Sequence, residues 1–402
     1  MLQYWLWLTT RRNVGRKRIR NLLERFETPE AIYRASAQDY ENAELDASET
    51  ESLLQKDLVE ARKILLRCEE KQIEILTIQD SRYPERLRQI DDPPVLLYYR
   101  GTLPDFDKEP AITVVGARNA TAYGEVNARR LGYQLGRCGM LVVTGIARGI
   151  DAQALEGALT ADATVCAVLG CGADVVYPKQ NAALYQEVIR HGCLLTEYPP
   201  GTPPEGRHFP VRNRILSALS LGVLVVEASL KSGALITARR ALEQGRDVFA
   251  VPANIDLDTA AGSNRLLRDG AIWTECGWDV AREYAHLFPE QIQKYASETE
   301  PPALVTQKES PNSEKIMLKD DKIRIDNQKS KRYIDLHKIW NTLDETEQAI
   351  AAALEGGPKS ADEMMEDAQI PASKLLAALT MLEVQGIVKR LPGGVYTLAE
   401  EP

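Results

Sequence analysis

Glycine and cationic residues recur just after short apolar runs in the central part of the chain. The runs are Ala111–Val115, Met140–Val143, Val165–Leu169 and Val223–Val226. The residues that follow them are Gly116 and Arg118, Gly145 and Arg148, Tyr177 and Lys179, and Lys231, Ser232 and Gly233. Glycine lets backbone N–H groups approach a ligand closely, and Arg and Lys neutralise anionic oxygens. This pattern predicts a groove for several phosphate groups.

The elements that must position these residues are strands of a parallel sheet. A continuous apolar run between turn signals is typical of a strand buried on both faces. Helices are expected between the strands, over Tyr123–Gly136, Asp151–Thr160, Ala182–His191, Arg214–Leu219 and Ala234–Gln244. In such α/β sheets ligands bind outside the carboxyl ends of the strands, which is where the glycines and cations fall.

A fifth segment, read as a turn before a helix, holds the densest cationic cluster. It provides an aromatic ring, an amide and two guanidinium groups: Phe209, Asn213, Arg212 and Arg214. Rings can stack on bases while guanidinium groups clamp phosphates, which fits a single nucleic-acid strand. Tyr177 is a second candidate for stacking. Glu227 is expected to orient Arg212 or Arg214, because no nucleophile, second carboxylate or metal site accompanies it.

Two polar residues are expected to shape the turns. Asp151 fits a helix N-cap that leaves the preceding amides and Arg148 facing an anion. Alternatively, Asp151 and Arg148 pair and fix the loop, and the two interpretations are compatible. Asn181 is expected to cap the helix that begins at Ala182.

Several nucleotide-dependent classes are not expected. Gly116-Ala-Arg118 resembles the first turn of a dinucleotide fold, but GxGxxG is incomplete and the acidic residue expected further on is missing. The chain has no GxxxxGK[ST] motif. The six cysteines lack paired metal spacing and the four histidines are scattered. No catalytic residue, cofactor or metal is therefore expected.

Charge and length frame the remaining expectations. The 402 residues predict more than one domain, and the net charge of −9 argues against a general basic coat for duplex DNA. It leaves room for a local basic groove. The apolar Leu2–Leu8 stretch is short and precedes Arg11 and Arg12, the wrong order for a signal peptide, so a cytoplasmic protein with no membrane partner is expected.

The N-terminal residues 1–70 are predicted to be helical. Arg18–Phe26 places apolar residues on one face, and Thr28 opens the next helix. Asn13–Lys17 resembles half of a helix–hairpin–helix, while a small helical bundle with solvated cations is the alternative. Residues 71–110 form a connector with two candidate strands, at the start of a central domain over 71–288.

The C-terminal region is predicted to be a polar, flexible linker over 289–339 and a small domain over 340–402. Asp344, Ser360 and Pro371 start three helices, and Ile387–Leu391 with Val395–Leu398 forms a hairpin. This order is the winged-helix pattern. Residues 341–402 carry eleven acidic against four basic residues, so a protein-interaction or regulatory role is favoured over groove recognition.

Taken together, the turns resemble the DNA-processing protein A family, also called DprA or Smf. The resemblance covers nearly all of residues 75–275 and rests on these motifs, in order: Val115–Arg118, Thr144–Asp151, Gly170–Gly172, Tyr177–Asn181, Glu197–Gly201, Phe209–Arg214 and Val226–Ala234. It implies a Rossmann-like, mostly parallel α/β sheet, with a helical N-terminal domain of SAM or helix–hairpin–helix type and a C-terminal winged helix. It also implies single-stranded DNA as ligand, dimerisation through the central domain, protection of incoming DNA and loading of RecA in natural transformation.

Carried over residue by residue, the resemblance places these residues in the phosphate pocket: Gly116, Arg118, Gly145, Arg148, Lys179, Arg212, Arg214, Lys231 and Ser232. The chain departs from the family at Thr144, Leu155 and Ala253, where Ser, His and Gly are usual. The absence of the histidine weakens any acid–base chemistry. A phosphoribohydrolase on the same fold is the alternative, but the loop Lys231–Thr237 lacks that class's PGGxGTxxE pattern. A binder rather than an enzyme is favoured.

Overall fold

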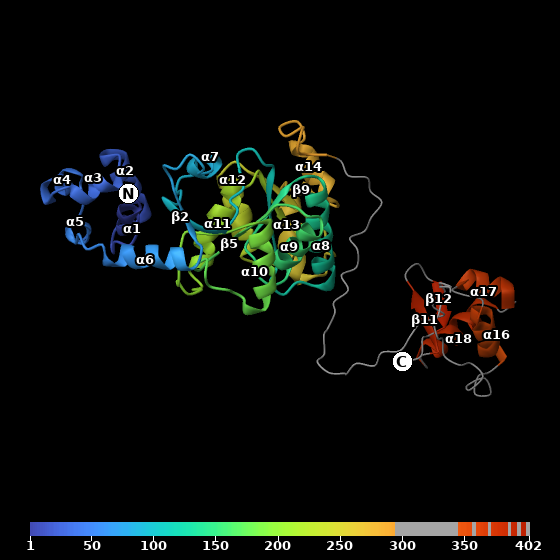
Figure 1. Ribbon diagram of the computed structural model, residues 1–402. Helices are drawn as coiled ribbons and strands as arrows, with labels where there is room; N and C mark the ends of the chain where they lie inside the picture. Colours follow the sequence, from blue (N-terminus) through green and yellow to red (C-terminus); the bar gives the residue numbers. More distant parts are fainter. Residues whose placement is uncertain (294–344, 356–358, 369–370, 385–386, 392–394, 399–402) are drawn as a thin grey trace, which may run out of the picture. The chain divides into compact units, whose positions relative to one another are not determined.

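The computed structural model describes residues 1–293, 345–355, 359–368, 371–384, 387–391 and 395–398. It divides into two compact units, Met1–Thr306 and Gln307–Pro402, which are considered separately (Figure 1). Most of the predicted linker and the predicted helix cap Asp344 lie outside the described residues.

A nine-stranded sheet forms the centre of the first unit. The strands are β1 (Glu74–Thr77), β2 (Leu96–Gly101), β3 (Ala111–Val115), β4 (Leu141–Thr144), β5 (Val165–Val168), β6 (Gly192–Thr196), β7 (Gly222–Val225), β8 (Asp247–Ala250) and β9 (Ile272–Trp273). Their order is β1-β2-β6-β5-β4-β3-β7-β8-β9. The pairs from β6 to β9 are parallel, which confirms the prediction for the four apolar runs. The two connector strands, β1 and β2, extend the sheet as an antiparallel edge.

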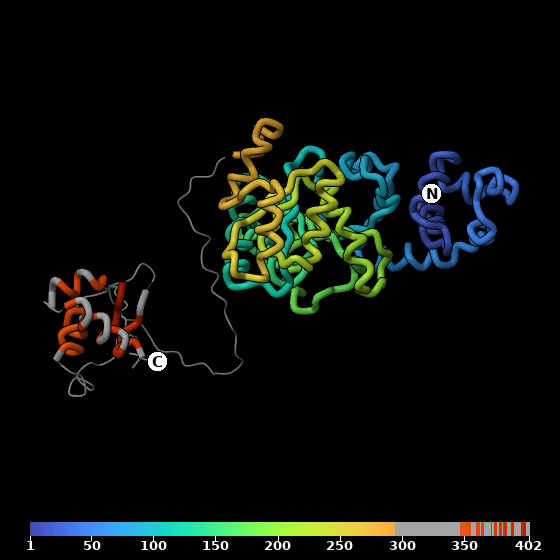
Figure 2. The backbone as a smooth tube through the Cα atoms, turned by 180° about the vertical axis from the view of Figure 1, so that it is seen from behind, coloured from blue at the N-terminus to red at the C-terminus, as the bar shows by residue number. Residues whose placement is uncertain are grey.

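Helices cover both faces of the sheet and bury two apolar cores (Figures 1 and 2). One core is covered by α8 (Ala122–Arg137), α9 (Ile150–Thr160), α10 (Ala182–His191) and α14 (Gly277–Tyr284). The other is covered by α7 (Glu85–Arg88), α11 (His208–Leu219) and α12 (Ala234–Glu243), with α13 (Ala261–Arg268) packed against β8. Strand residues such as Ile112, Val142 and Val223 are completely buried, as the continuous apolar runs require.

The strand order reverses between β3 and β7. After β3 the chain builds β4, β5 and β6 on one side, and it then returns to build β7, β8 and β9 on the other. The connections on either side of this switch point diverge, which opens a crevice at the carboxyl ends of β3 and β7. The Gly- and Arg-rich turns after these strands therefore flank the crevice.

The N-terminal helices lie at one end of this unit, and α14 lies at the other, in both views (Figures 1 and 2). They are α1 (Leu2–Thr9), α2 (Arg16–Phe26), α3 (Pro29–Arg34), α4 (Ala37–Asn42), α5 (Ala47–Leu54) and α6 (Val59–Glu70). Their core includes Trp7, Tyr40 and Leu53 and continues onto Leu96 and Tyr98 of β2. Thr28 caps α3 by accepting from the Ala31 N–H, as predicted.

One predicted turn is wrong. Phe209–Arg214 lies inside α11, whose first residue is His208. Pro210 is the third residue of this helix, where a missing N–H costs nothing because first-turn N–H groups have no partner within the helix. The helix therefore starts earlier than the proline and the polar residues indicated.

The second unit has the predicted winged-helix order. Helices α16 (Glu345–Glu355), α17 (Ala361–Ala368) and α18 (Ala372–Val384) accompany strands β10 (Lys359–Ser360), β11 (Val388–Leu391) and β12 (Val395–Leu398). The strands pair in the order β10-β12-β11. Ser360 caps α17 as predicted, because its Oγ accepts from the Glu363 N–H while the Glu363 carboxylate accepts from the Ser360 N–H. Across the described parts of both units, each helix is too short or too polar to cross a bilayer.

Candidate nucleic-acid interface

A cavity of about 570 Å³ lies at the switch point of the sheet. It is lined by the turn after β3, Gly116–Asn119, by Ser229, Ser232 and Gly233 after β7, and by the first turns of α11. A second cavity of about 260 Å³ adjoins it and shares Arg118, Ala147, Tyr177 and Phe209. The predicted crevice is therefore present as two connected hollows.

Ten of the residues predicted for the site line these hollows: Gly116, Arg118, Gly145, Arg148, Tyr177, Phe209, Arg212, Asn213, Ser232 and Gly233. Lys179 is exposed between Pro178 and Gln180, which line the smaller hollow. Lys231 is exposed beside Ser232. Arg214 lines a different pocket, on the other side of α11.

The Phe209 ring is the centre of the shared wall. The Arg118 Cζ lies 5.1 Å from its centroid and the Arg212 Cζ lies 5.9 Å from it. The Tyr177 ring lies 5.6 Å from the Phe209 ring at an interplanar angle of 38°. Tyr177 is 40 % exposed, so an aromatic face borders the cations at the mouth of the cavities. A base can stack on such a face while its phosphates meet guanidinium groups.

Arg212 is buried and forms the floor of the site. Its Nη1 donates to the Gly145 carbonyl at 3.1 Å and to the Val168 carbonyl at the end of β5. Burial lowers the pKa of Arg212, and the nearby Asp151 carboxylate opposes that shift. A Cβ at position 145 would lie 2.4 Å from Nη2, so only glycine leaves room for this arginine.

Asp151 organises the loop from the inside. It stands in the first turn of α9, whose N-cap residue is Gly149, and its carboxylate accepts from the N–H groups of Gly145 (3.0 Å) and Ala147 (3.4 Å). The prediction that Asp151 caps the helix and leaves these amides to an anion is wrong. Burial raises the pKa of Asp151, while Arg212 and the two amides act against that rise.

Arg148 and Asn181 also differ from their predicted contacts. Arg148 donates to the Asn119 Oδ1 at 3.2 Å and does not form an ion pair with Asp151. Asn181 precedes α10 but does not cap it with its side chain, which instead donates to the Ile146 carbonyl at 3.0 Å. Ile146 has φ of +50°, rare for a β-branched residue, and the Thr144 Oγ1 accepts from its N–H. These bonds fix the strained loop that carries Arg148.

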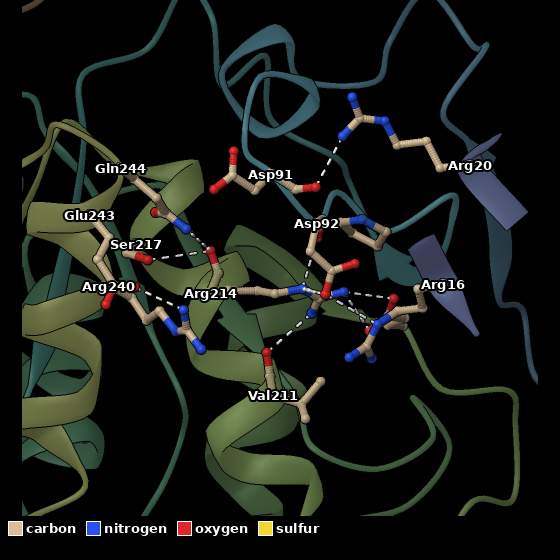
Figure 3. A network of polar contacts seen from close by, with 12 residues as sticks. Arg16, Arg20, Asp91, Asp92, Val211, Arg214, Ser217, Arg240, Glu243 and Gln244 are labelled. Atoms are coloured by element: carbon tan, nitrogen blue, oxygen red, sulfur yellow. Dashed lines mark hydrogen bonds and ion pairs between the residues drawn. The ribbon is translucent and has the colours of Figure 1, made fainter. Parts of the chain in front are cut away.

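Arg214 is engaged within the protein. Its guanidinium contacts the Glu197 carboxylate at 2.8 Å and the Asp92 carboxylate at 3.2 Å (Figure 3). The Arg214 side chain is 8 % exposed, and its charge is neutralised by these carboxylates outside the two hollows. Its phosphate-binding role stays a prediction, which this geometry does not favour.

Glu227 does not orient either arginine of α11, which makes that prediction wrong. It is buried, and its carboxylate accepts from the N–H and the Oγ1 of Thr121 at the start of α8. Its place beside Gly124, where a Cβ would lie 2.2 Å from its Oε2, shows that it fastens α8 to the end of β7.

Four cations of the site remain available to a ligand: Arg118, Arg148, Lys179 and Lys231. Each is exposed, and none forms an ion pair within the described part of the chain. The same described residues contain no group of three or more His, Cys, Asp or Glu side chains that could hold a metal ion. The site's chemistry therefore consists of positive charge, backbone amides and aromatic faces.

Sequence reasoning missed Asn119, which lines the larger cavity and positions Arg148. Asn119 directly follows Arg118 in the turn after β3, and this position could have identified it as a site residue. It also missed Asp92 and Glu197 as partners of Arg214, because both are distant in sequence and their meeting depends on how the connector folds.

The fold and this site define a Rossmann-like protein with a cationic crevice at the switch point of its sheet. Residues 74–285 match the family model of DNA recombination-mediator protein A, and residues 341–394 match that of the DprA winged helix domain. Protein Smf of Synechocystis sp. is 32 % identical over 410 residues, which cover 98 % of each chain. The chain belongs to the DprA/Smf family, and its function is that of a DNA recombination mediator.

Two solved structures carry the same family name. DNA processing protein A from Streptococcus pneumoniae is 34 % identical, covers 70 % of this chain and 98 % of its own, and has a TM-score of 0.63. DNA processing protein A from Helicobacter pylori, whose structure concerns a single-stranded DNA binding mode, is 28 % identical over 55 % of this chain and 98 % of its own, with a TM-score of 0.48.

Proposed function

We propose that this protein binds single-stranded DNA in the two connected hollows at the switch point. The observation that carries the proposal is the set of four exposed, unpaired cations around the aromatic wall of Phe209 and Tyr177. Arg118, Arg148, Lys179 and Lys231 would meet phosphates, with the amides near Gly116 and Gly233 and the polar side chains of Asn213 and Ser232 beside them.

The geometry favours a single strand over a duplex. The aromatic face stands at the mouth of a cavity, where an unpaired base can reach it and a paired base cannot. The site occupies one crevice in a chain of net charge −9, whereas a duplex binder presents a broad basic surface. Membership of the family supports DNA as the class of ligand. The structure of the H. pylori member concerns its binding of single-stranded DNA.

Family membership supports a proposal for the wider role. We propose that the protein protects incoming DNA, loads RecA onto it in the cytoplasm during natural transformation, and dimerises through the Rossmann-like domain. Sedimentation of the full chain over a concentration series tests the dimer, and RecA filament assembly on protein-coated single strands tests the loading.

Binding without turnover is the proposed mechanism. The crevice holds no buried acid–base pair, since Asp151 and Glu227 are both occupied by backbone or hydroxyl donors. A phosphoribohydrolase, the alternative on this fold, would use water to break the N-glycosidic bond of a nucleoside monophosphate and release the free base and ribose phosphate. Incubation with mononucleotides should therefore give no ribose phosphate.

The deciding experiment is fluorescence anisotropy with labelled oligo-dT, a matched duplex and a mononucleotide, at two salt concentrations. We expect the single strand alone to bind tightly, with an affinity that falls as salt rises. Arg118→Ala should weaken binding and flatten the salt dependence by roughly 0.7 in log–log slope for one lost phosphate contact. Unchanged binding by Arg118→Ala, or preference for the mononucleotide, would overturn the proposal.

A further inference from the structure

A second cationic region lies at the start of the N-terminal helices. Residues 11–26 carry seven basic residues and a single acidic one, Glu24, in a chain that is acidic overall. Most of these cations belong to α2. The two hollows at the switch point do not include any of them.

Arg16 joins this region to the central domain. Its guanidinium lies 3.3 Å from the Glu197 carboxylate and 3.2 Å from the Asp92 carboxylate. The same two carboxylates hold Arg214 of α11, so one four-residue network links α2 to the helix that carries the site (Figure 3). Arg20, one turn further along α2, donates to the Asp91 carbonyl at 3.0 Å. The first turns of α2 are thereby fixed beside the connector before β2.

A row of contacts leads from this network to the aromatic wall. Tyr198 directly follows Glu197, and its ring is stacked on His208 with centroids 4.1 Å apart at an angle of 26°. His208 directly precedes Phe209 in α11. The Tyr198 side chain is half-buried, and the His208 side chain is 12 % exposed. A continuous row of contacts therefore links the aromatic wall to Arg16.

The ion-pair network at the end of this row is balanced in charge. Asp92 and Glu197 are each compensated by Arg16 and Arg214, so the network does not repel an anion. Arg18 contacts Glu49, and Arg20 contacts Glu24. Arg12 and Lys17, on either side of Arg16, are exposed and form no ion pair among the described residues. Their charges are open to solvent and suited to the phosphates of a strand.

We propose that single-stranded DNA bound at the switch point continues over the Tyr198–His208 pair to Arg12 and Lys17 at the start of α2. The N-terminal helices then act as a second part of one binding track. This inference rests on the proposed function of the hollows. It assigns to α2 a ligand of the same chemistry, a nucleic-acid backbone, and it predicts that short strands occupy the hollows alone.

The test compares a short oligo-dT of about 6 nucleotides with a long one of about 20, a range that brackets typical single-strand site sizes. The variant Arg12→Glu/Lys17→Glu is measured in the full chain by anisotropy. We expect roughly tenfold weaker binding of the long strand and a salt slope smaller by about 1.4, from two lost phosphate contacts. Binding of the short strand should stay unchanged.

The control variant Arg34→Glu/Lys63→Glu makes the same change of charge on α3 and α6 of the same helical region. It should bind both strands as the unmodified chain does, and circular dichroism should show that both double variants are folded. Three results would each overturn the proposed track. They are an equal loss of affinity in the control variant, an equal loss of affinity for the short and long strands in Arg12→Glu/Lys17→Glu, and unchanged affinity of that variant for the long strand. If the proposed function of the hollows is itself wrong, the Arg118→Ala variant will bind both strands as the unmodified chain does, which distinguishes that outcome from failure of the track alone.

Discussion

Phe209 connects the charged and aromatic parts of the site. Its ring contacts Arg118, Arg212 and Tyr177, so it both offers a face for a base and holds an exposed guanidinium in place. Burial of Arg212 is possible because carbonyl groups at the ends of two strands receive its N–H donors. The site is thus built on rigid elements beneath a thin layer of exposed cations.

Phe209→Ala should therefore weaken single-strand binding by about 1–3 kcal/mol, the usual value of one base–aromatic stack. Phe209→Tyr keeps the ring and should restore most of the affinity. Anisotropy with oligo-dT measures both variants. Equal affinity of the Ala and Tyr variants would show that the ring does not contact DNA.

Two glycines of the site give a matched pair of substitutions. Gly145→Ala places a Cβ 2.4 Å from the buried Arg212 Nη2, whereas a Cβ at Gly233 meets no atom within 4 Å. Gly145→Ala should cost about 1–3 kcal/mol in the free energy of unfolding and displace Arg212. Gly233→Ala should leave stability unchanged or raise it by up to about 1 kcal/mol, since its φ of −61° suits alanine. Denaturant unfolding measures both, and similar midpoints would contradict this account of Arg212.

Much of the site was predictable, because cations and glycines after apolar runs must meet at one edge of a parallel sheet. The contacts of individual side chains were not. Asp151, Asn181 and Glu227 were expected to cap helices or orient arginines, and each instead bonds a neighbouring loop or helix. Such pairings depend on the depth and angle at which elements pack, which local sequence does not encode.

At the scale of elements, the strands with continuous apolar runs were predicted best. Burial on both faces favours apolar residues, and Val, Ile and Leu make up most of β3 and β7. The start of α11 was not predicted, because Pro210 and the three polar residues that follow it are typical of a turn. The antiparallel edge of β1 and β2 was found as strands, but its pairing with β6 is a long-range contact that periodicity cannot indicate.

The N-terminal helices contain an element-scale electrostatic feature. The Lys56 Nζ lies 4.9–5.4 Å from the ring centroids of Trp7, Tyr33 and Tyr40, and it donates to the Tyr40 hydroxyl at 2.6 Å. Burial lowers the pKa of Lys56 from 10.5 to about 8. Between these two pH values the unfolded chain holds a proton that the folded chain lacks. The free energy of unfolding should therefore rise with pH across this interval.

The variant Lys56→Met removes this dependence and keeps Tyr40 bonded to the Ile32 carbonyl. From pH 8 to 10 the unfolding midpoint of the unmodified chain should rise by about 2–4 °C relative to the variant, a value discounted for the partial exposure of Lys56. Lys63→Met, an exposed lysine of α6, is the control and should behave as the unmodified chain does. Parallel pH profiles for Lys56→Met and the unmodified chain would contradict the lowered pKa.

At the scale of the whole molecule, charge is divided between the two units. The winged-helix region, residues 341–402, carries eleven acidic and four basic residues, whereas the available cations of the site all belong to the first unit. Its third helix, α18, offers Lys374 alone as a cation. An acidic domain does not add phosphate contacts, so its contribution to single-strand binding should be neutral or repulsive.

A chain that ends at residue 306 tests this division, because the first unit has its own cores and forms a compact body without the second. It should bind oligo-dT at least as tightly as the full chain and with a salt slope at least as steep, since the number of phosphate contacts is unchanged and only a screened repulsion is removed. Any gain in affinity should disappear at high salt, where repulsion by the acidic region is screened. A tenfold or greater loss of affinity for oligo-dT, together with a smaller salt slope, would show instead that the winged helix contacts DNA directly. Its role would then be DNA binding rather than partner binding.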